Sequence, residues 1–141
     1  MADDGSDFAR SMSIATSGLR AQAGRMRVIS ENIANADSTA PTAAGNPYRR
    51  KVPTFSSALD RTLDARVVTL GKIRTDQSAF RVKHEPSNPA ADAAGNVKYP
   101  NVNPLVEMTD MREAQRSYEA NLNLISATRR MIQRTLDILK A

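Results

Sequence analysis

The chain has 141 residues, of which 40% are hydrophobic and only 4% aromatic, so there is room for one domain without a large aromatic core. It contains no cysteine, which excludes disulfides, cysteine nucleophiles and cysteine-bound zinc. A single histidine cannot form a histidine cluster for a metal. We therefore expect no metal and no cofactor.

The net charge of +5 and the pI of about 10.0 make nucleic acid or an anionic membrane candidate partners. Most of the excess lies in residues 37–104, which hold ten basic and six acidic side chains, and both signs are mixed throughout. No apolar run approaches the ~20 residues of a transmembrane helix. The first ten residues, MADDGSDFAR, are acidic where a secretory signal is basic. We expect neither membrane insertion nor a cleaved signal peptide.

All seven prolines lie between Pro41 and Pro104. Because proline interrupts helices, the chain divides into a helical segment 1–38, a broken middle segment 39–102 and a helical segment 103–141.

The first segment has an apolar stripe that repeats at alternating steps of four and three residues, as in a coiled-coil seam. Ser6 or Asp7 is predicted to cap its start, and Asn35 to end it in a left-handed conformation. The nine positions of the stripe, of which only Gln22 is polar, are Phe8, Met12, Ala15, Leu19, Gln22, Met26, Ile29, Ile33 and Ala36.

The last segment opens with Asn103 as a helix cap and Pro104 at the first helical position. Its apolar positions also recur at threes and fours, with one interruption at Arg129. They are Met111, Ala114, Tyr118, Leu122, Ile125, Ile132, Leu136 and Leu139. At 1.5 Å per residue, the two predicted helices are about 42 Å and 52 Å long.

These patterns predict a mainly α fold in which two long terminal helices pair as a coiled-coil-like hairpin, joined by a proline-rich middle segment with short β-strands. In that middle, 65–70 and 79–83 are predicted strands, 48–55 is extended, 56–63 is a short helical turn and 85–95 is a surface loop. A chain this small buries little surface alone. The seams therefore favour assembly with other copies, against the alternative of a monomeric helical hairpin.

Catalytic motifs are absent from the sequence, so the chain is not expected to be an enzyme. His84 is interpreted as an exposed loop histidine, and Asp60 with Asp64 as a solvated face rather than paired catalytic carboxylates.

The densest basic cluster is Arg49, Arg50 and Lys51, which is typical of a solvated turn or of contact with an acidic patch on a protein partner. The alternative function is a nucleic-acid-binding adaptor built on the helical hairpin. Its contacts would come from Arg49, Arg50, Lys51, Arg129, Arg130 and Arg134.

Two stretches resemble the flagellar rod and hook protein family. The first runs from Ser17, SGLRAQAGRMRVISENIANADS, and is followed by Tyr48-Arg49-Arg50-Lys51. The second begins at Tyr99, YPNVNPLVEMTDMREAQRSYEANLNLISATRRM. The motif residues carried by this resemblance are Asn32, Asn35, Ala36, Asp37, Ser38, Asn101, Asn103, Ser117, Glu119 and Asn121.

The resemblance implies a structural subunit of the flagellar proximal rod, which assembles helically into a torque-transmitting shaft with a central export channel. Both terminal segments would form its inner tube domain. The implied partners are copies of itself, other proximal and distal rod proteins, proteins of the junction between the MS ring and the rod, and the type III export apparatus. The implied location is the periplasmic rod of the basal body, reached without signal cleavage, and no nucleic acid, cofactor or enzyme activity is implied.

We hypothesise that the two seams bury apolar side chains within and between subunits, and that the ends are partly disordered before assembly. The role of Arg129 on the second seam stays open. The predicted packing residues are Leu19, Met26, Ile29, Ile33, Tyr118, Leu122, Ile125, Ile132 and Leu136.

Overall fold

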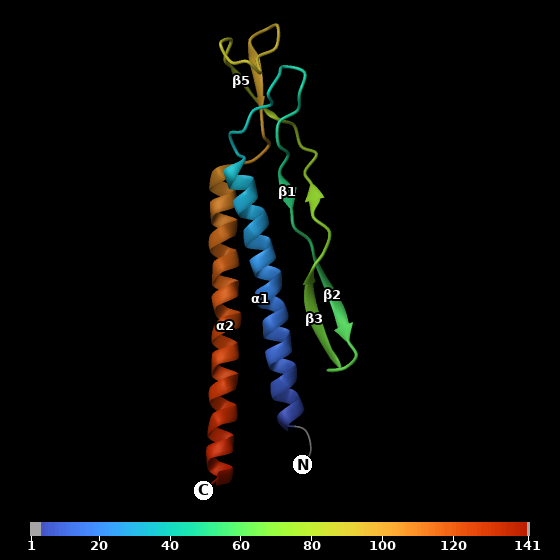
Figure 1. Ribbon diagram of the computed structural model, residues 1–141, viewed down its shortest axis with the longest axis vertical. Helices are drawn as coiled ribbons and strands as arrows, with labels where there is room; N and C mark the ends of the chain where they lie inside the picture. The colour runs from blue at the N-terminus through green and yellow to red at the C-terminus, as the bar shows by residue number, and fades with distance from the viewer. Residues whose placement is uncertain (1–3, 141) are drawn as a thin grey trace. The chain divides into compact units, whose positions relative to one another are not determined.

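The computed structural model describes residues 4–140 and confirms two long terminal helices joined by short strands (Figure 1). Residues 1–3 and 141 of the predicted terminal segments lie outside the described residues. The elements are α1 (Asp4–Ala34), β1 (Lys51–Val52), β2 (Phe55–Asp60), β3 (Ala65–Leu70), β4 (Arg74–Thr75), β5 (Arg81–His84), β6 (Asn96–Tyr99) and α2 (Pro104–Lys140).

The ends of α1 differ from the prediction. Ser6 and Asp7 lie inside the helix rather than at its cap, because α1 already includes Asp4. Asn35 is not left-handed, since Asp64 is the one non-glycine residue of the described chain with a positive φ. Instead, Asn35 Nδ2 donates to the carbonyl of Glu31 at 2.8 Å, so the side chain satisfies a carbonyl of the last turn.

The start of α2 is as predicted. Pro104 is its first residue, where the missing N–H costs nothing. Asn103 Oδ1 accepts a hydrogen bond from the backbone N–H of Leu105 at 3.1 Å, which satisfies one of the free donors of the first turn.

The strands form three separate antiparallel pairs, β1 with β4, β2 with β3, and β5 with β6. Strand β3 matches the prediction, and β5 lies close to the predicted 79–83. The helical turn predicted at 56–63 is wrong, because residues 55–60 pair along their whole length with β3. Strands β4 and β6 were not predicted, since two to four residues carry too little periodicity to identify.

The chain folds into two compact units, and both helices pass from one into the other. Unit 1 comprises 4–26, 54–72 and 113–140, and unit 2 comprises Arg27–Pro53 and Ile73–Arg112.

In unit 1 the β2–β3 hairpin lies along α1 (Figure 1). Arg10 Nε donates to the carbonyl of Leu63 at 2.8 Å, and the N–H of Val68 donates to Ser17 Oγ at 3.2 Å. Leu70 packs where Gly24 leaves space, because a Cβ on Gly24 would lie 2.7 Å from Leu70 Cδ2. The glycine therefore permits the close approach of hairpin and helix.

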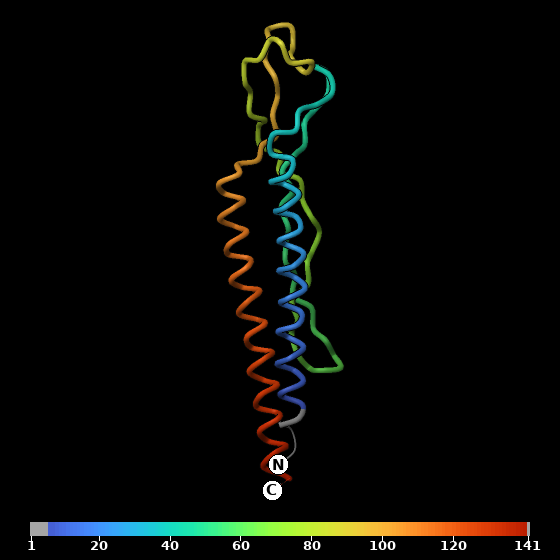
Figure 2. The backbone as a smooth tube through the Cα atoms, turned by 60° about the vertical axis from the view of Figure 1, so that its left-hand side comes forward, coloured from blue at the N-terminus to red at the C-terminus, as the bar shows by residue number. Residues whose placement is uncertain are grey.

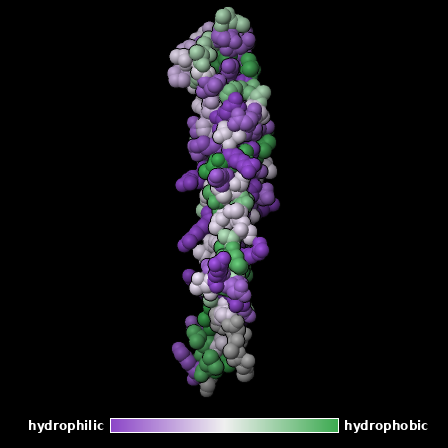
Figure 3. Space-filling view, turned by 90° about the vertical axis from the view of Figure 1, so that its right-hand side faces the viewer, coloured by the Kyte–Doolittle hydropathy of each residue, from purple (hydrophilic) through white to green (hydrophobic). Residues whose placement is uncertain are grey.

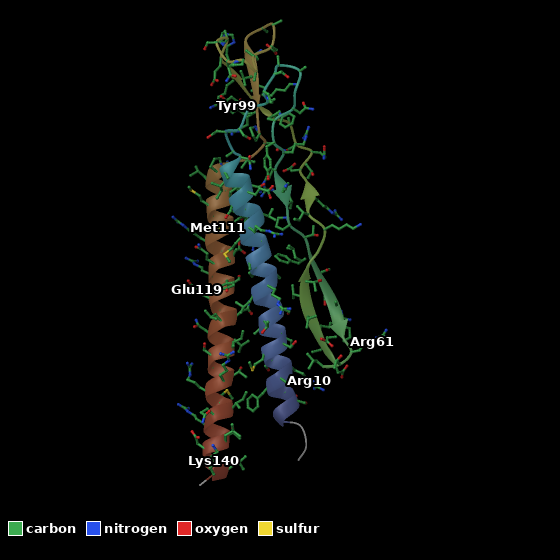
Figure 4. All side chains as sticks on the ribbon, in the orientation of Figure 1. Arg10, Arg61, Tyr99, Met111, Glu119 and Lys140 are labelled. Carbon is green, nitrogen blue, oxygen red and sulfur yellow. The ribbon has the colours of Figure 1, made fainter. Side chains whose placement is uncertain are left out.

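Unit 2 has its core around the β5–β6 hairpin and the last turns of α1. Val97 and Tyr99 of β6 pack with Ala90, while Val28 and Ile29 of α1 are also buried. The Tyr99 hydroxyl donates to Glu85 Oε2 at 2.8 Å, so this buried aromatic ring has its polar atom satisfied. Tyr99 is labelled in Figure 4.

Candidate assembly site

A cluster of polar side chains, two of them buried and three partly exposed, joins α1 to α2 within unit 2. This polar node consists of Asn32, Tyr48, Arg50, Asn101 and Glu107. Asn32 and Glu107 are both fully buried, with 0% exposure. Arg50 Nε donates to Glu107 Oε1 at 2.6 Å, and Asn32 Nδ2 donates to Glu107 Oε2 at 3.0 Å. Both carboxylate oxygens of Glu107 therefore have partners, as a buried charge requires.

Asn32 also binds the strand that follows the basic cluster. Its Oδ1 accepts from the Tyr48 hydroxyl at 2.8 Å and from the backbone N–H of Lys51 at 2.9 Å. Its Nδ2 donates to the carbonyl of Lys51 at 2.8 Å as well as to Glu107. One amide thus links α1, β1 and α2.

Arg50 connects the node to further acidic groups. Its Nη1 lies 3.9 Å from Asp76 Oδ2, and its Nη2 lies 3.6 Å from Asp110 Oδ2. Asn101 Oδ1 accepts from the Arg50 backbone N–H at 2.8 Å, while Asn101 Nδ2 donates to Ser78 Oγ at 2.9 Å. The loop around residue 76 is therefore held to the same centre.

Two pKa values are shifted at this centre. Burial, followed by the charges of Glu31 and Glu107, raises the pKa of Tyr48 to about 12. Hydrogen bonds from the backbone and side chain of Ser78, with smaller help from Arg50, lower the pKa of Asp76 below its usual value. The phenol of Tyr48 is therefore held in its protonated form, and the carboxyl of Asp76 in its ionised form.

The basic cluster is engaged within unit 2, and its acidic contacts belong to its own chain. Besides the Arg50 contacts, the Arg49 guanidinium stacks on the Phe80 ring at 4.1 Å and donates to the carbonyl of Ser78 at 3.2 Å. Lys51 Nζ pairs with Glu31. This cluster therefore gives no structural support to phosphate or nucleic-acid binding.

In unit 1, α1 and α2 run antiparallel and side by side (Figure 2). Gly18 allows close contact, because a Cβ there would lie 2.8 Å from Asn121 Nδ2. Arg25 Nη2 lies 3.6 Å from Glu113 Oε2. Ala15 and Ala114 are buried. The helix seam of unit 1 is therefore built largely from small side chains.

The predicted packing residues fall into three groups. Ile29 and Ile125 are buried, whereas Leu122 and Leu136 are exposed on α2. The intermediate group is Leu19, Met26, Ile33, Tyr118 and Ile132. Their assignment to packing between subunits stays a prediction.

The motif residues of the resemblance have distinct environments. Asn32 and Asn101 belong to the polar node, and Asn103 caps α2. Arg81 Nη2 donates to the carbonyl of Ala36 at 2.7 Å and to Asp37 Oδ1 at 3.4 Å. The remaining motif residues lie near helix ends or on α2: Asn35, Ser38, Ser117, Asn121 and the exposed Glu119, which is labelled in Figure 4.

Sequence reasoning did not single out Glu107 or Arg50 as partners. A glutamate in the first turn of a helix usually faces solvent, and no local pattern reveals a pairing across 57 residues of chain. The one sequence feature that pointed to this site was the basic cluster 49–51, because Arg50 is its middle member.

Helix α2 exposes an apolar stripe, defined as Leu124, Met131 and Ile138, at seven-residue spacing. Their exposed fractions are 47%, 54% and 75%. Figure 3 shows apolar side chains gathered where α2 ends. Neither helix, over the described residues, has the length and apolarity needed to cross a membrane. Such a stripe is typical of a surface that another protein covers.

A groove of about 500 Å³ lies between α1 and β3 in unit 1, with Met12, Val67 and Leu70 beside Arg20 and Asp60. Within the described residues, no group of three or more acidic or histidine side chains is placed to hold a metal ion.

Two stretches of the chain, which include most of α1 and most of α2, match known protein families. Residues 12–40 match the family described as flagella basal body rod protein, and residues 93–138 match the flagellar basal body rod FlgEFG protein C-terminal family. The first match includes Asn32 and the second includes Glu107, so the polar node joins the two matched regions.

Similar proteins align over nearly their whole length. The flagellar basal-body rod protein FlgC of Agrobacterium fabrum is 52% identical over 128 residues, which are 91% of this chain and 92% of the relative. FlgC of Bacillus subtilis is 38% identical over 143 residues, or 91% and 95% of the two chains. FlgC of Salmonella typhimurium is 38% identical over 126 residues, or 89% and 92%.

The chain belongs to the family of flagellar basal-body rod proteins. Within that family, the relatives described above are FlgC proteins. It is a structural subunit of the flagellar rod, located in the basal body, and it assembles with other rod and basal-body components. Nothing in the comparisons supports the nucleic-acid-binding alternative.

Replacing Glu107 by glutamine is expected to destabilise unit 2, because the buried carboxylate that pairs with the partly exposed Arg50 guanidinium becomes a neutral amide. The free energy of unfolding should fall by roughly 1.5–3 kcal/mol, as for the loss of a hydrogen bond between charged groups, measured by urea unfolding followed by tyrosine fluorescence. The matched control is Glu119→Gln on the exposed side of α2, which should change stability by less than about 0.5 kcal/mol. Equal stabilities of the two variants would contradict the role given to Glu107.

Tyr48 is expected to titrate with a pKa of about 12. An unfolded tyrosine loses its proton near pH 10. The stabilising contribution of the Tyr48 phenol is therefore complete below pH 10 and is lost as the pH rises towards 12. Tyrosinate absorbance should show this late step, and Tyr48→Phe should remove it. Loss of an earlier step instead would show that the assignment is wrong.

Proposed function

We propose that this chain is a proximal-rod subunit that stacks helically with copies of itself and with other rod proteins to form a torque-transmitting shaft around an export channel. The observation that carries the proposal is the apolar stripe of α2, which stays exposed although α2 already packs against α1 in unit 1. A structural subunit needs such a second contact surface, because one face is used inside the chain and another joins it to its neighbours.

The energetics favour assembly of many copies. Burial of a large apolar side chain stabilises by roughly 1.5–3 kcal/mol, and the contribution is repeated in every subunit. Leu122 and Leu136, together with the apolar stripe, would contribute on α2, while Leu19 and Met26 would contribute from α1. Their partial exposure in the single chain supports this assignment.

The finer parts of the proposal rest on family membership. The terminal segments would form the inner tube domain, and the middle segment would contact neighbours on the outer side. The partners would include proteins of the junction between the MS ring and the rod and the type III export apparatus, and the location would be the periplasm, reached without a cleaved signal. No catalysis and no cofactor is assigned to this structural role.

The ends of the chain would be partly disordered before assembly. Support comes from unit 1, where the buried side chains are mostly alanine and bury little apolar area: Ala15, Ala21, Ala65 and Ala114, with Ile125 and Thr128. Circular dichroism of the dilute subunit should show less helix than the 31 and 37 residues of α1 and α2. Complete, protease-resistant helices in the dilute subunit would contradict this part of the proposal.

Charges on the apolar stripe should block incorporation into the rod. We expect Met131→Glu with Ile138→Glu to fold like the parent, since both positions are exposed, but to be missing from isolated basal bodies and to leave cells non-motile. Burial of an unpaired carboxylate at a contact costs several kcal/mol, at least about 3. The matched control is Gln133→Glu, an exposed polar position between them. Normal incorporation of the double variant would refute the proposed contact surface.

A further inference from the structure

The contacts between α1 and α2 follow one register in both units. Gly18 faces Asn121 in unit 1, and Asn32 is hydrogen-bonded to Glu107 in unit 2. Asn32 lies fourteen residues after Gly18, and Glu107 lies fourteen residues before Asn121. Fourteen residues are two heptads, so the same antiparallel alignment of two continuous helices accounts for both contacts.

The seam of unit 1 does not by itself select this register. If α2 slid by one heptad, Ala114 or Thr128 would take the place of Asn121 opposite Gly18. Both are small, and both are already buried. Small side chains present similar shapes at successive heptads, so the packing around Gly18 would change little. The slide would also break the Arg25–Glu113 pair, but Glu113 is 67% exposed there, and such surface pairs contribute little. Most of the selection must therefore come from elsewhere.

The polar node of unit 2 is specific for one register. The same slide would bring Ala114 or Pro100 to the position of Glu107, next to Asn32. The fully buried Asn32 amide would then lose its carboxylate partner, and the Arg50 guanidinium, which is 23% exposed, would lose its shortest ion pair; both losses are unfavourable. A slide of four residues would place Asn103 or Met111 there, and neither carries a charge.

We propose that the polar node is a register lock, which selects a single alignment of α2 against α1 from several that the small-residue seam permits. Single buried polar groups have this role in coiled coils, where they determine alignment at some cost in stability. The lock acts through hydrogen-bond matching, because only Glu107 offers two carboxylate oxygens to Arg50 and Asn32 at once.

Disulfide trapping can read the register, because the chain has no cysteine of its own. Three double-cysteine variants report the register, and each combines Gly18→Cys with one of Asn121→Cys, Ala114→Cys and Thr128→Cys. In the alignment seen in the structure, only positions 18 and 121 are close. The other two are displaced by seven residues, about 10 Å along the helix, which is beyond disulfide reach. Non-reducing gels separate intramolecular products from crosslinked dimers, so the readout does not depend on rod assembly.

A full-length triple variant that combines Asn32→Leu, Arg50→Met and Glu107→Leu removes the lock. The native disulfide is the one between positions 18 and 121, and the displaced disulfides are those between 18 and 114 or between 18 and 128. We expect the triple variant to keep its helix content by circular dichroism and to raise the ratio of displaced to native disulfides about tenfold or more. The control combines Glu119→Leu with Arg130→Met, two exposed positions on α2, and should give the native disulfide alone.

Retained helix with only the native disulfide would overturn the proposal. If the triple variant loses its helix, the single variant Glu107→Gln decides, because it keeps the shape of the side chain. Displaced disulfides in that variant support the lock, and the native disulfide alone overturns it. Failure of the lock leaves the proposed assembly surface untouched, because that surface is tested by incorporation into basal bodies.

Discussion

A carboxylate with no solvent exposure organises this protein. Glu107 cannot stay ionised in the interior without partners, so Arg50 and Asn32 must come to it from distant parts of the chain. Tyr48 and Asn101 then complete the hydrogen bonds of those partners. The end of α1, the strand β1, the loop around residue 76 and the start of α2 therefore converge on one centre in unit 2.

Unit 1 is built on a different physical basis. Its helix seam consists mostly of alanine and glycine, which allow close approach but bury little apolar area. Larger apolar side chains, including Leu124, Met131 and Ile138, remain exposed. In the proposed assembly a rod subunit would benefit from this division, since the polar node joins segments of the single chain while the exposed stripe would supply free energy of assembly.

Sequence reasoning succeeded where local signals were strong. The Asn103–Pro104 start of α2 and the β-branched run of β3 were predicted because caps and alternation act within a few residues. It failed at 56–63, where pairing with β3 overrides a local helical tendency, and at Asn35, whose side chain binds a carbonyl of its own helix. Glu107 was overlooked because an isolated helical glutamate carries no sign of burial.

The sequence by itself determined the two terminal helices, which have no proline in their interiors, the interrupted middle and the family motifs, because helix periodicity, capping and motif identity are properties of neighbouring residues. Only the tertiary structure decided that the Arg49–Lys51 cluster is engaged inside the chain and that Glu107 is buried. It also showed which predicted seam residues remain exposed. Ion pairing and burial depend on segments far apart in sequence, and their meeting is set by the packing of the whole unit.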